Sequence, residues 1–243
     1  MTEENNKLEK PSNIVEMFKP KKWGIAAAKE QAKKAIADLD PSTMEHRLGI
    51  VFDDSGSMGS QVDDKSKIEH AHAGIRNFTT QCNPKDTSLA IYPLNKTPQA
   101  LTCNYDVLNL YVGTIRESGG TPLYTITTKM LNEADLTRGV LFSDGSPTDG
   151  HAGYGEEYDK DLKEDMINLA ITKKVPLDTI FIGYNGEGGY DLLKEIADRT
   201  GGIFVHFKDA KALGASLKYL APALRGILMN AELKEKIQRG ETI

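Results

Sequence analysis

From residue 47 onward, short apolar runs alternate with longer segments in which apolar residues recur every three or four positions. The short runs predict strands, and the longer segments predict amphipathic helices. Predicted strands occupy residues 48–52, 89–94, 139–142, 179–182 and 203–207, and predicted helices occupy 68–82, 122–134, 158–173 and 191–200. Such alternation is typical of a doubly wound, mostly parallel sheet with helices on both faces. The expected fold class is therefore α/β.

Three further segments are less regular. Residues 99–104 form a candidate edge strand beside 89–94, and residues 107–115 predict a short helix or an irregular crossover. A long final helix is expected from Ala210 towards Met229, with a kink at Pro222 because proline lacks the N–H that a helix interior needs. These segments would complete the α/β part of the chain.

The first 45 residues differ from the rest, because lysines among alanines are interrupted by prolines. Asn13 and Glu16 predict a capping box that opens a short helix. Apolar residues spaced along 25–39 predict a second helix, which either packs on the main domain or serves as a docking arm for a partner. The expected domains are a helical extension at 1–45, an α/β domain at 46–229 and a polar tail at 230–243.

Charge and composition argue against several functions. The 243 residues carry 30 Lys and Arg against 35 Asp and Glu, a formal charge of −5, which disfavours a broad nucleic-acid interface. No apolar run approaches the roughly 20 residues that cross a bilayer, and the polar start lacks a signal-peptide core. The chain is expected to be cytoplasmic, with no nucleic-acid or membrane partner. Cys82 and Cys103 are expected to be reduced, buried thiols.

Three oxygen-rich segments lie where strands end or a helix begins. Residues 53–57 (DDSGS) follow the first predicted strand, residues 119–122 (GGTP) precede a helix, and residues 143–145 (SDG) follow the strand at 139–142. Each alone is an ordinary turn, but ligands of such sheets gather at the carboxyl ends of the strands. The candidate metal ligands in these segments are Asp53, Ser55, Ser57, Thr121 and Asp144.

This donor set consists of two carboxylates and three hydroxyls, without histidine or cysteine. Oxygen ligands suit a hard divalent cation and suit zinc or copper poorly. Mg²⁺ fits best, because it accepts few carboxylates and keeps several waters, and Mn²⁺ and Ca²⁺ are the alternatives. An ion held largely by neutral hydroxyls stays a strong Lewis acid, so we expect it to seek a carboxylate from outside the domain.

The three segments together resemble a known family motif. VFDDSGSM (51–58), GGTPLY (119–124) and LFSDGSPTD (141–149) resemble the metal-ion-dependent adhesion site (MIDAS) of von Willebrand factor A domains, and residues 182–207 resemble that family's later strand, helix and TGG turn. The resemblance covers roughly residues 45–229. It implies a six-stranded sheet with one antiparallel edge strand, placed at 99–104. It also implies that the three hydroxyls bind the metal and that the two carboxylates bind it directly or through water.

The resemblance implies a function in protein–protein interaction rather than catalysis. The metal of such a site captures a Glu or Asp carboxylate of a protein partner, and in some members a change in coordination moves the last helix, here 210–229. The short segments look most like stand-alone cytoplasmic members from bacteria and phages, including tellurite-resistance-associated ones. With all five motif positions present, an intact site is expected.

Two other functions compete with this interpretation. A magnesium-dependent phosphohydrolase of the haloacid-dehalogenase type would use Asp53 as nucleophile, with Ser143, Asp144 and Asp149 as its late acidic motif. That chemistry needs a second acid two residues after the nucleophile, where this chain has Ser55, and no well-placed lysine is evident. The other alternative is a scaffold in which the metal only stabilises the fold.

Residues near the motif carry weaker expectations. Asp54 is expected to be a solvated or capping carboxylate, and Asp149 either braces its loop or faces water. His70 and His72 are two residues apart on a helix, cannot both face one ligand, and are expected in the core or on the surface. The loop that contains His151 is expected to border the metal site.

Overall fold

The computed structural model describes Glu30 and residues 34–36, 38–62, 65–149, 155–182 and 189–207, without the side chains at 62, 155–158 and 207. The chain divides into two units, residues 1–38 and 39–243. In the first unit the described positions 30 and 34–36 are helical. The predicted helices opened by Asn13 and by Ala210, and the loop with His151, lie outside the described residues.

The second unit is built on a six-stranded sheet in the order β5-β4-β1-β6-β7-β8. Its strands are β1 (His46–Phe52), β4 (Thr87–Pro93), β5 (Gln99–Thr102), β6 (Arg138–Ser143), β7 (Leu177–Ile182) and β8 (Phe204–Phe207). β5 pairs antiparallel with β4 at the edge, and all other pairs are parallel. The predicted fold class and the antiparallel edge strand are therefore confirmed.

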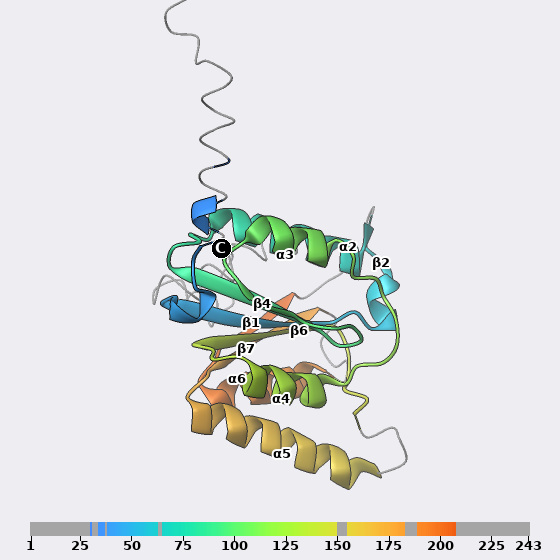
Figure 1. The fold of residues 1–243 in the computed structure, drawn as a ribbon. Coiled ribbons are helices and arrows are strands. Elements are labelled where there is room, and N and C mark those ends of the chain that lie inside the picture. The colour runs from blue at the N-terminus through green and yellow to red at the C-terminus, as the bar shows by residue number, and fades with distance from the viewer. Residues whose placement is uncertain are drawn as a thin grey trace, which may run out of the picture. The chain divides into compact units, whose positions relative to one another are not determined.

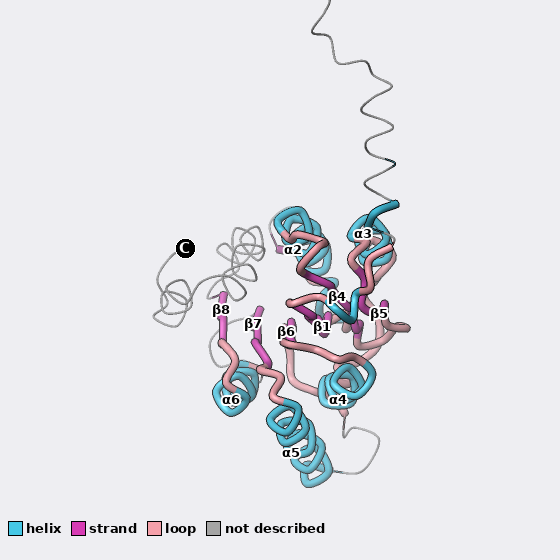
Figure 2. Tube along the Cα trace, turned by 60° about the vertical axis from the view of Figure 1, so that its left-hand side comes forward, coloured by secondary structure: helices cyan, strands magenta, loops and turns pink. Residues whose placement is uncertain are grey.

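Helices cover both faces of the sheet (Figures 1 and 2). α2 (Lys67–Gln81) and α3 (Tyr105–Val112) lie on one face, and α4 (Leu123–Glu133), α5 (Gly155–Lys173) and α6 (Tyr190–Thr200) lie on the other. The crossover at 107–115 is thus a helix, α3. Four short elements complete the list: η1 (Pro41–Thr43), η2 (Gly56–Gly59), β2 (Gln61–Val62) and β3 (Lys65–Ser66). The two-residue strands β2 and β3 were not predicted, because they are too short to show a period.

Each face of the sheet has its own apolar core. Ile50 and Phe52 of β1 pack in the cluster that α2 and α3 complete, whereas Val51 packs in the cluster that α4, α5 and α6 complete. All seven residues of β4 are buried. Strands covered on both sides show continuous apolar runs instead of alternation, which is the pattern that the sequence shows. Both cysteines are free, with Cys103 buried as expected and Cys82 only half-buried at the C-cap of α2.

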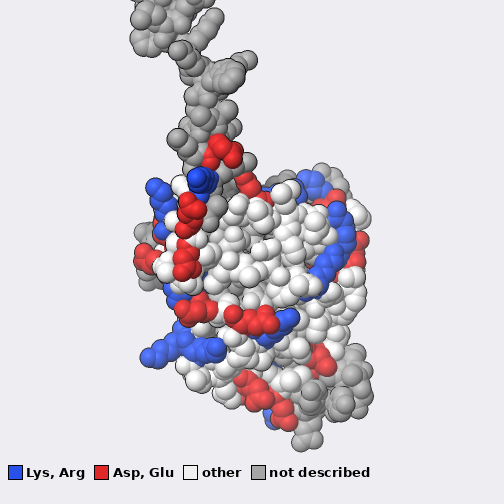
Figure 3. Space-filling model, in the orientation of Figure 1, with Lys and Arg blue, Asp and Glu red and all other residues white. Residues whose placement is uncertain are grey.

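The surface is of mixed charge. Acidic and basic side chains ring the face shown in Figure 3, and the centre of that face carries few of either. α3 exposes two large apolar side chains, Val107 and Leu110. In the described part of the chain, no helix is long and apolar enough to cross a membrane.

The register of the central strands brings three loops to one edge of the sheet. Phe52 of β1 lies opposite Pro93 of β4 and Phe142 of β6 in parallel pairing. The residues that follow these three positions therefore leave the sheet side by side. Asp53 N–H still donates to the carbonyl of Phe142 at 3.1 Å, and Leu94 N–H donates to the carbonyl of Phe52 at 3.2 Å.

Candidate functional site

Asp53 is the centre of the first loop (residues 53–57), which follows β1. It is fully buried, with Oδ1 accepting a hydrogen bond from Ser55 N at 2.8 Å and Oδ2 accepting one from Ser143 Oγ at 2.6 Å. Burial raises the pKa of Asp53, and the nearby charge of Asp144 adds to this, while the hydrogen bonds from Ser143 and Ser55 oppose it. Asp53 thus links the end of β1 to the end of β6.

Hydroxyl groups extend from this point towards the second carboxylate. Ser55 Oγ and Ser57 Oγ lie 3.0 Å apart, and Ser57 Oγ donates to Asp144 Oδ1 at 2.7 Å. Ser55 is the N-cap of η2, and that single turn carries Ser57 back over the end of β6. Four of the five candidate ligands therefore form one hydrogen-bonded cluster, across 87 residues of sequence between Ser57 and Asp144.

Thr121, the fifth candidate, belongs to the second loop (residues 118–122), which precedes α4. Two backbone hydrogen bonds fasten this loop to the first, from Ser118 N to the Asp54 carbonyl at 2.6 Å and from Gly56 N to the Gly119 carbonyl at 3.3 Å. Thr121 is buried, and its N–H donates to Thr148 Oγ1 at 2.7 Å. These backbone contacts hold the loop of Thr121 beside the first loop, but no hydrogen bond among the described residues joins its hydroxyl to the cluster.

Asp54 corrects one expectation. It is fully buried rather than solvated, and its Oδ1 accepts hydrogen bonds from Asn95 N at 2.9 Å and from Asn95 Nδ2 at 3.1 Å. Asn95 Nδ2 also donates to the Gly120 carbonyl at 2.9 Å, so the pair holds the first loop to the second. Burial raises the pKa of Asp54. Its capping role was expected, but its burial was missed because neighbouring strand-end residues rarely both turn inward.

Lys67 is the functional residue that the sequence gave no sign of. Its Nζ lies 2.5 Å from Asp144 Oδ2, and the two side chains are 16% and 1% exposed. The sequence showed no well-placed lysine for a phosphohydrolase, and the fold brings Lys67 to the motif. Lys67 opens α2, whose capping box joins Ser66 and Glu69 and fixes the first turn. A lysine at a helix start is usually solvated, so its position in the sequence did not indicate that Lys67 would contact Asp144.

Two other neighbours have structural roles. Asp149 accepts hydrogen bonds from Tyr124 N at 3.2 Å and from Thr125 N at 2.8 Å, which satisfies free N–H groups at the start of α4. Of the two roles expected for Asp149, the structure shows the one in which it braces its loop. His70 and His72 are both buried in α2.

The cluster can hold a cation through oxygen atoms. It joins two carboxylates to hydroxyls at an edge of the sheet, and one carboxylate already carries the Lys67 ammonium. The described residues contain no group of three or more His, Cys, Asp and Glu side chains placed to hold a metal, which is the arrangement that zinc favours. The residues fit a hard divalent ion whose ligands are largely hydroxyls.

Solved structures of other proteins share this fold. They include a von Willebrand factor type A protein from Catenulispora acidiphila (18% identity, 75% of this chain and 43% of that chain, TM-score 0.55). The pilus adhesin SpaC from Lactobacillus rhamnosus GG in its open conformation is 13% identical over 80% of this chain and 30% of that chain, with a TM-score of 0.53. BatB from Bacteroides thetaiotaomicron is 15% identical over 73% of this chain and 99% of that chain, with a TM-score of 0.51.

These likenesses show that the chain has the von Willebrand factor A fold. No protein-family model matches the sequence, and no curated protein matches it. The chain spans nearly the whole of BatB but less than half of the Catenulispora protein and of SpaC. At such low identities the comparison concerns the arrangement of strands and helices and not the chemistry of the loops.

Gly119 offers a test of how the second loop is held. Its φ is +69°, and an added Cβ would lie 2.4 Å from Asn95 Oδ1. We predict that Gly119→Ala lowers the free energy of unfolding by about 1–3 kcal/mol, because the left-handed backbone would be strained and Asn95 displaced. Chemical denaturation measures this change.

Gly145→Ala is the matched control, because a Cβ there meets no atom within 4 Å. Its free energy of unfolding should stay within about 0.5 kcal/mol of the wild type. Equal stabilities for the Gly119→Ala and Gly145→Ala variants would show that Gly119 and Asn95 do not hold the loop.

Proposed function

We propose that the domain is a metal-dependent protein-interaction module in which a bound Mg²⁺ captures a Glu or Asp carboxylate of a protein partner. Asp53, Ser55, Ser57, Thr121 and Asp144 would hold the ion. The observation that carries this proposal is the hydrogen-bonded cluster of hydroxyls and carboxylates at the carboxyl ends of β1 and β6.

The donor set favours Mg²⁺, with Mn²⁺ and Ca²⁺ as the alternatives, because all its ligand atoms are hard oxygens. When bound, the ion would supply a positive charge that the three neutral hydroxyls do not reduce. Asp53 and Asp144 would offset only part of it, because Ser143 and Lys67 already compensate these two carboxylates. That charge is what an anionic side chain of a partner would bind. The chain itself orients the donors: Ser143 and the Ser55 N–H hold Asp53, and η2 holds Ser57 over Asp144.

Lys67 has a defined part in this proposal. Its ammonium lies on Asp144 Oδ2 and neutralises a carboxylate that is otherwise excluded from water. A divalent ion and Lys67 would compete for this carboxylate, because both need its negative charge. The lysine therefore stabilises the metal-free domain and sets how tightly the ion binds.

The fold supports the interaction part of the proposal. Among the similar structures, SpaC is a pilus adhesin. A phosphohydrolase is less well supported, because that chemistry needs a second acid two residues after Asp53 to protonate the leaving group, and this chain has Ser55 there. Lys67 removes one objection to that chemistry but does not supply the missing acid. A purely structural metal would change stability without changing partner capture.

Calorimetric titration of chelator-stripped protein with Mg²⁺ tests the site. We predict saturable binding by the wild type and at least about tenfold weaker binding by Asp144→Ala and by Ser57→Ala, since each loses a donor. Asp106→Ala, which removes an exposed carboxylate from α3, is the matched control and should bind as the wild type does. Wild-type affinity in Asp144→Ala and Ser57→Ala, or turnover of p-nitrophenyl phosphate, would contradict the proposal.

Substitution of Lys67 tests the competition. We predict that Lys67→Met binds Mg²⁺ about tenfold or more tightly, and that its metal-free form melts at a lower temperature, because Asp144 is left buried without its counter-ion. Lys65→Met removes the same charge two residues away, where the lysine makes no ion pair with Asp144, and should change neither property. Calorimetric titration measures the Mg²⁺ affinity, and thermal melting in EDTA measures the stability of the metal-free form. Unchanged Mg²⁺ affinity in Lys67→Met would rule out competition between the ion and the lysine.

A further inference from the structure

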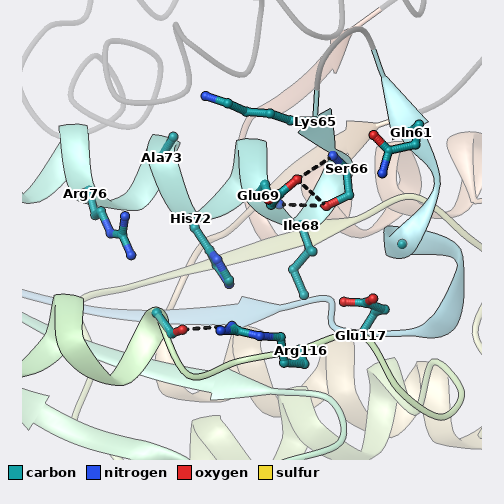
Figure 4. Close-up of a pocket in the computed structure, with 12 residues that line it drawn as sticks. Gln61, Lys65, Ser66, Ile68, Glu69, His72, Ala73, Arg76, Arg116 and Glu117 are labelled. Carbon is teal, nitrogen blue, oxygen red and sulfur yellow. Dashed lines mark hydrogen bonds between the residues drawn. The ribbon is translucent and has the colours of Figure 1, made fainter.

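A cavity lies between α2 and the segment that follows α3 (Figure 4). Its volume is about 560 Å³, and most of the side chains that line it are polar or charged. The lining includes Gly59, the last residue of η2, and Gly113, the C-cap residue of α3. Pockets of this size hold small organic ligands.

Two arginines, Arg76 and Arg116, line this pocket near Gly113. Arg116 Nη1 donates to the carbonyls of Gly113 at 2.8 Å and Ile115 at 2.7 Å. Arg76 Nη2 reaches the same glycine, because a Cβ added to Gly113 would lie 3.0 Å from it. Among the described residues neither arginine forms an ion pair with a carboxylate. Two guanidinium groups without a carboxylate partner in the lining of one pocket favour an anion.

His72 provides an independent sign of a ligand. The residue is only 8% exposed, and its Nε2 is buried without a hydrogen-bond partner. A buried nitrogen of this kind is costly unless a ligand or a water satisfies it. The ring is stacked on Phe52, with centroids 5.7 Å apart, and in Figure 4 it points from α2 towards the segment that carries Arg116. Burial, with the charges of Arg76 and Arg116, lowers the pKa of His72 to about 4, so the ring is neutral at pH 7.

The acidic residues of the pocket lie towards its other end. Glu69 Oε2 accepts hydrogen bonds from Ser66 N at 2.9 Å and Ser66 Oγ at 3.1 Å, so the capping box already uses this carboxylate. The side chain of Glu117 packs against Gly59, where an added Cβ would lie 3.1 Å from its Cγ. With Lys65, the lining holds three cationic side chains against these two carboxylates.

We propose that this pocket binds a small phosphomonoester, with the phosphate group between Arg76, Arg116 and His72. Two forked guanidinium groups can donate to the terminal oxygens of a phosphate, and a small rotation of the His72 ring would bring its buried Nε2 within reach of a third oxygen. A carboxylate has only two oxygens to offer. Glu69 and Glu117 would repel a second and third phosphate, so a monoester fits better than a triphosphate. The proposal does not depend on the metal site.

The test is calorimetry in EDTA at about 0.15 M salt, with adenosine monophosphate, adenosine triphosphate, inorganic phosphate and malonate as probes. We expect saturable binding of the monophosphate, weaker binding of inorganic phosphate, and no tighter binding of the triphosphate or of malonate. Arg76→Gln and Arg116→Gln should each weaken monophosphate binding at least tenfold. Arg76→Lys should fall between Arg76→Gln and the wild type, because it keeps the charge and loses the fork.

Lys129→Gln is the matched control, because it removes one positive charge from α4 on the opposite face of the sheet. It should bind the monophosphate as the wild type does. Arg76 and Arg116 are exposed, so their glutamine variants should keep the fold, and thermal melting checks this. In addition, the ¹⁵N resonance of His72 Nε2 should shift when the monophosphate is added to the wild type.

Four results would overturn the proposal. The first is no saturable binding of the monophosphate, and the second is wild-type affinity in Arg76→Gln and Arg116→Gln. The third is a loss of affinity in Lys129→Gln as large as in those two variants. The fourth is a His72 Nε2 resonance that does not move at saturation. Tighter binding of malonate or triphosphate would overturn the assigned ligand class. Because metal is absent from the assay, failure here leaves the Mg²⁺ titration of the first cluster unaffected, and the two proposals fail separately.

Discussion

Two carboxylates at the ends of adjacent parallel strands, Asp53 and Asp144, are the constraint on which the loops of this domain depend. Charges excluded from water are costly unless hydrogen bonds or opposite charges compensate them. Here the compensation comes from Ser143, Ser57 and Lys67, which belong to β6, η2 and α2. Satisfying the two acids therefore fixes how these three elements meet, and it gathers the oxygen atoms that the proposed metal site would use.

The fold was predictable because its central strands are buried on both faces. Covered strands show short apolar runs, and the connecting helices each keep one apolar side, so both patterns are visible along the sequence. The edge strand β5 was placed correctly by position, although its half-exposed residues carry little pattern. Strand ends were less exact: β1 begins at His46, two residues before the predicted start, because its pairing with β4 already begins at His46 and Thr87, before the first apolar residue, Leu48.

The clustering of Asp53, Ser55, Ser57 and Asp144 was also predictable, because the segments that carry them follow strand ends at one edge of the sheet. What surrounds them was not. Lys67, Asn95 and the burial of Asp54 depend on contacts between segments that are tens of residues apart, and no local spacing encodes them. The same holds for the pocket of Arg76 and Arg116, which lie on separate elements and meet only through the packing of α2 against α3. The partners of a buried charge come from segments far apart in the sequence, so the periodicity of apolar residues cannot predict them.

In the proposed function a divalent ion replaces the lysine at Asp144. A crystal structure of the protein at saturating Mn²⁺, with anomalous difference density recorded at the manganese edge, would show whether it does. We expect one strong anomalous peak contacted by Ser55, Ser57 and Asp144, with the Lys67 ammonium withdrawn from Asp144. A structure without that peak, in which Lys67 still rests on Asp144, would contradict it.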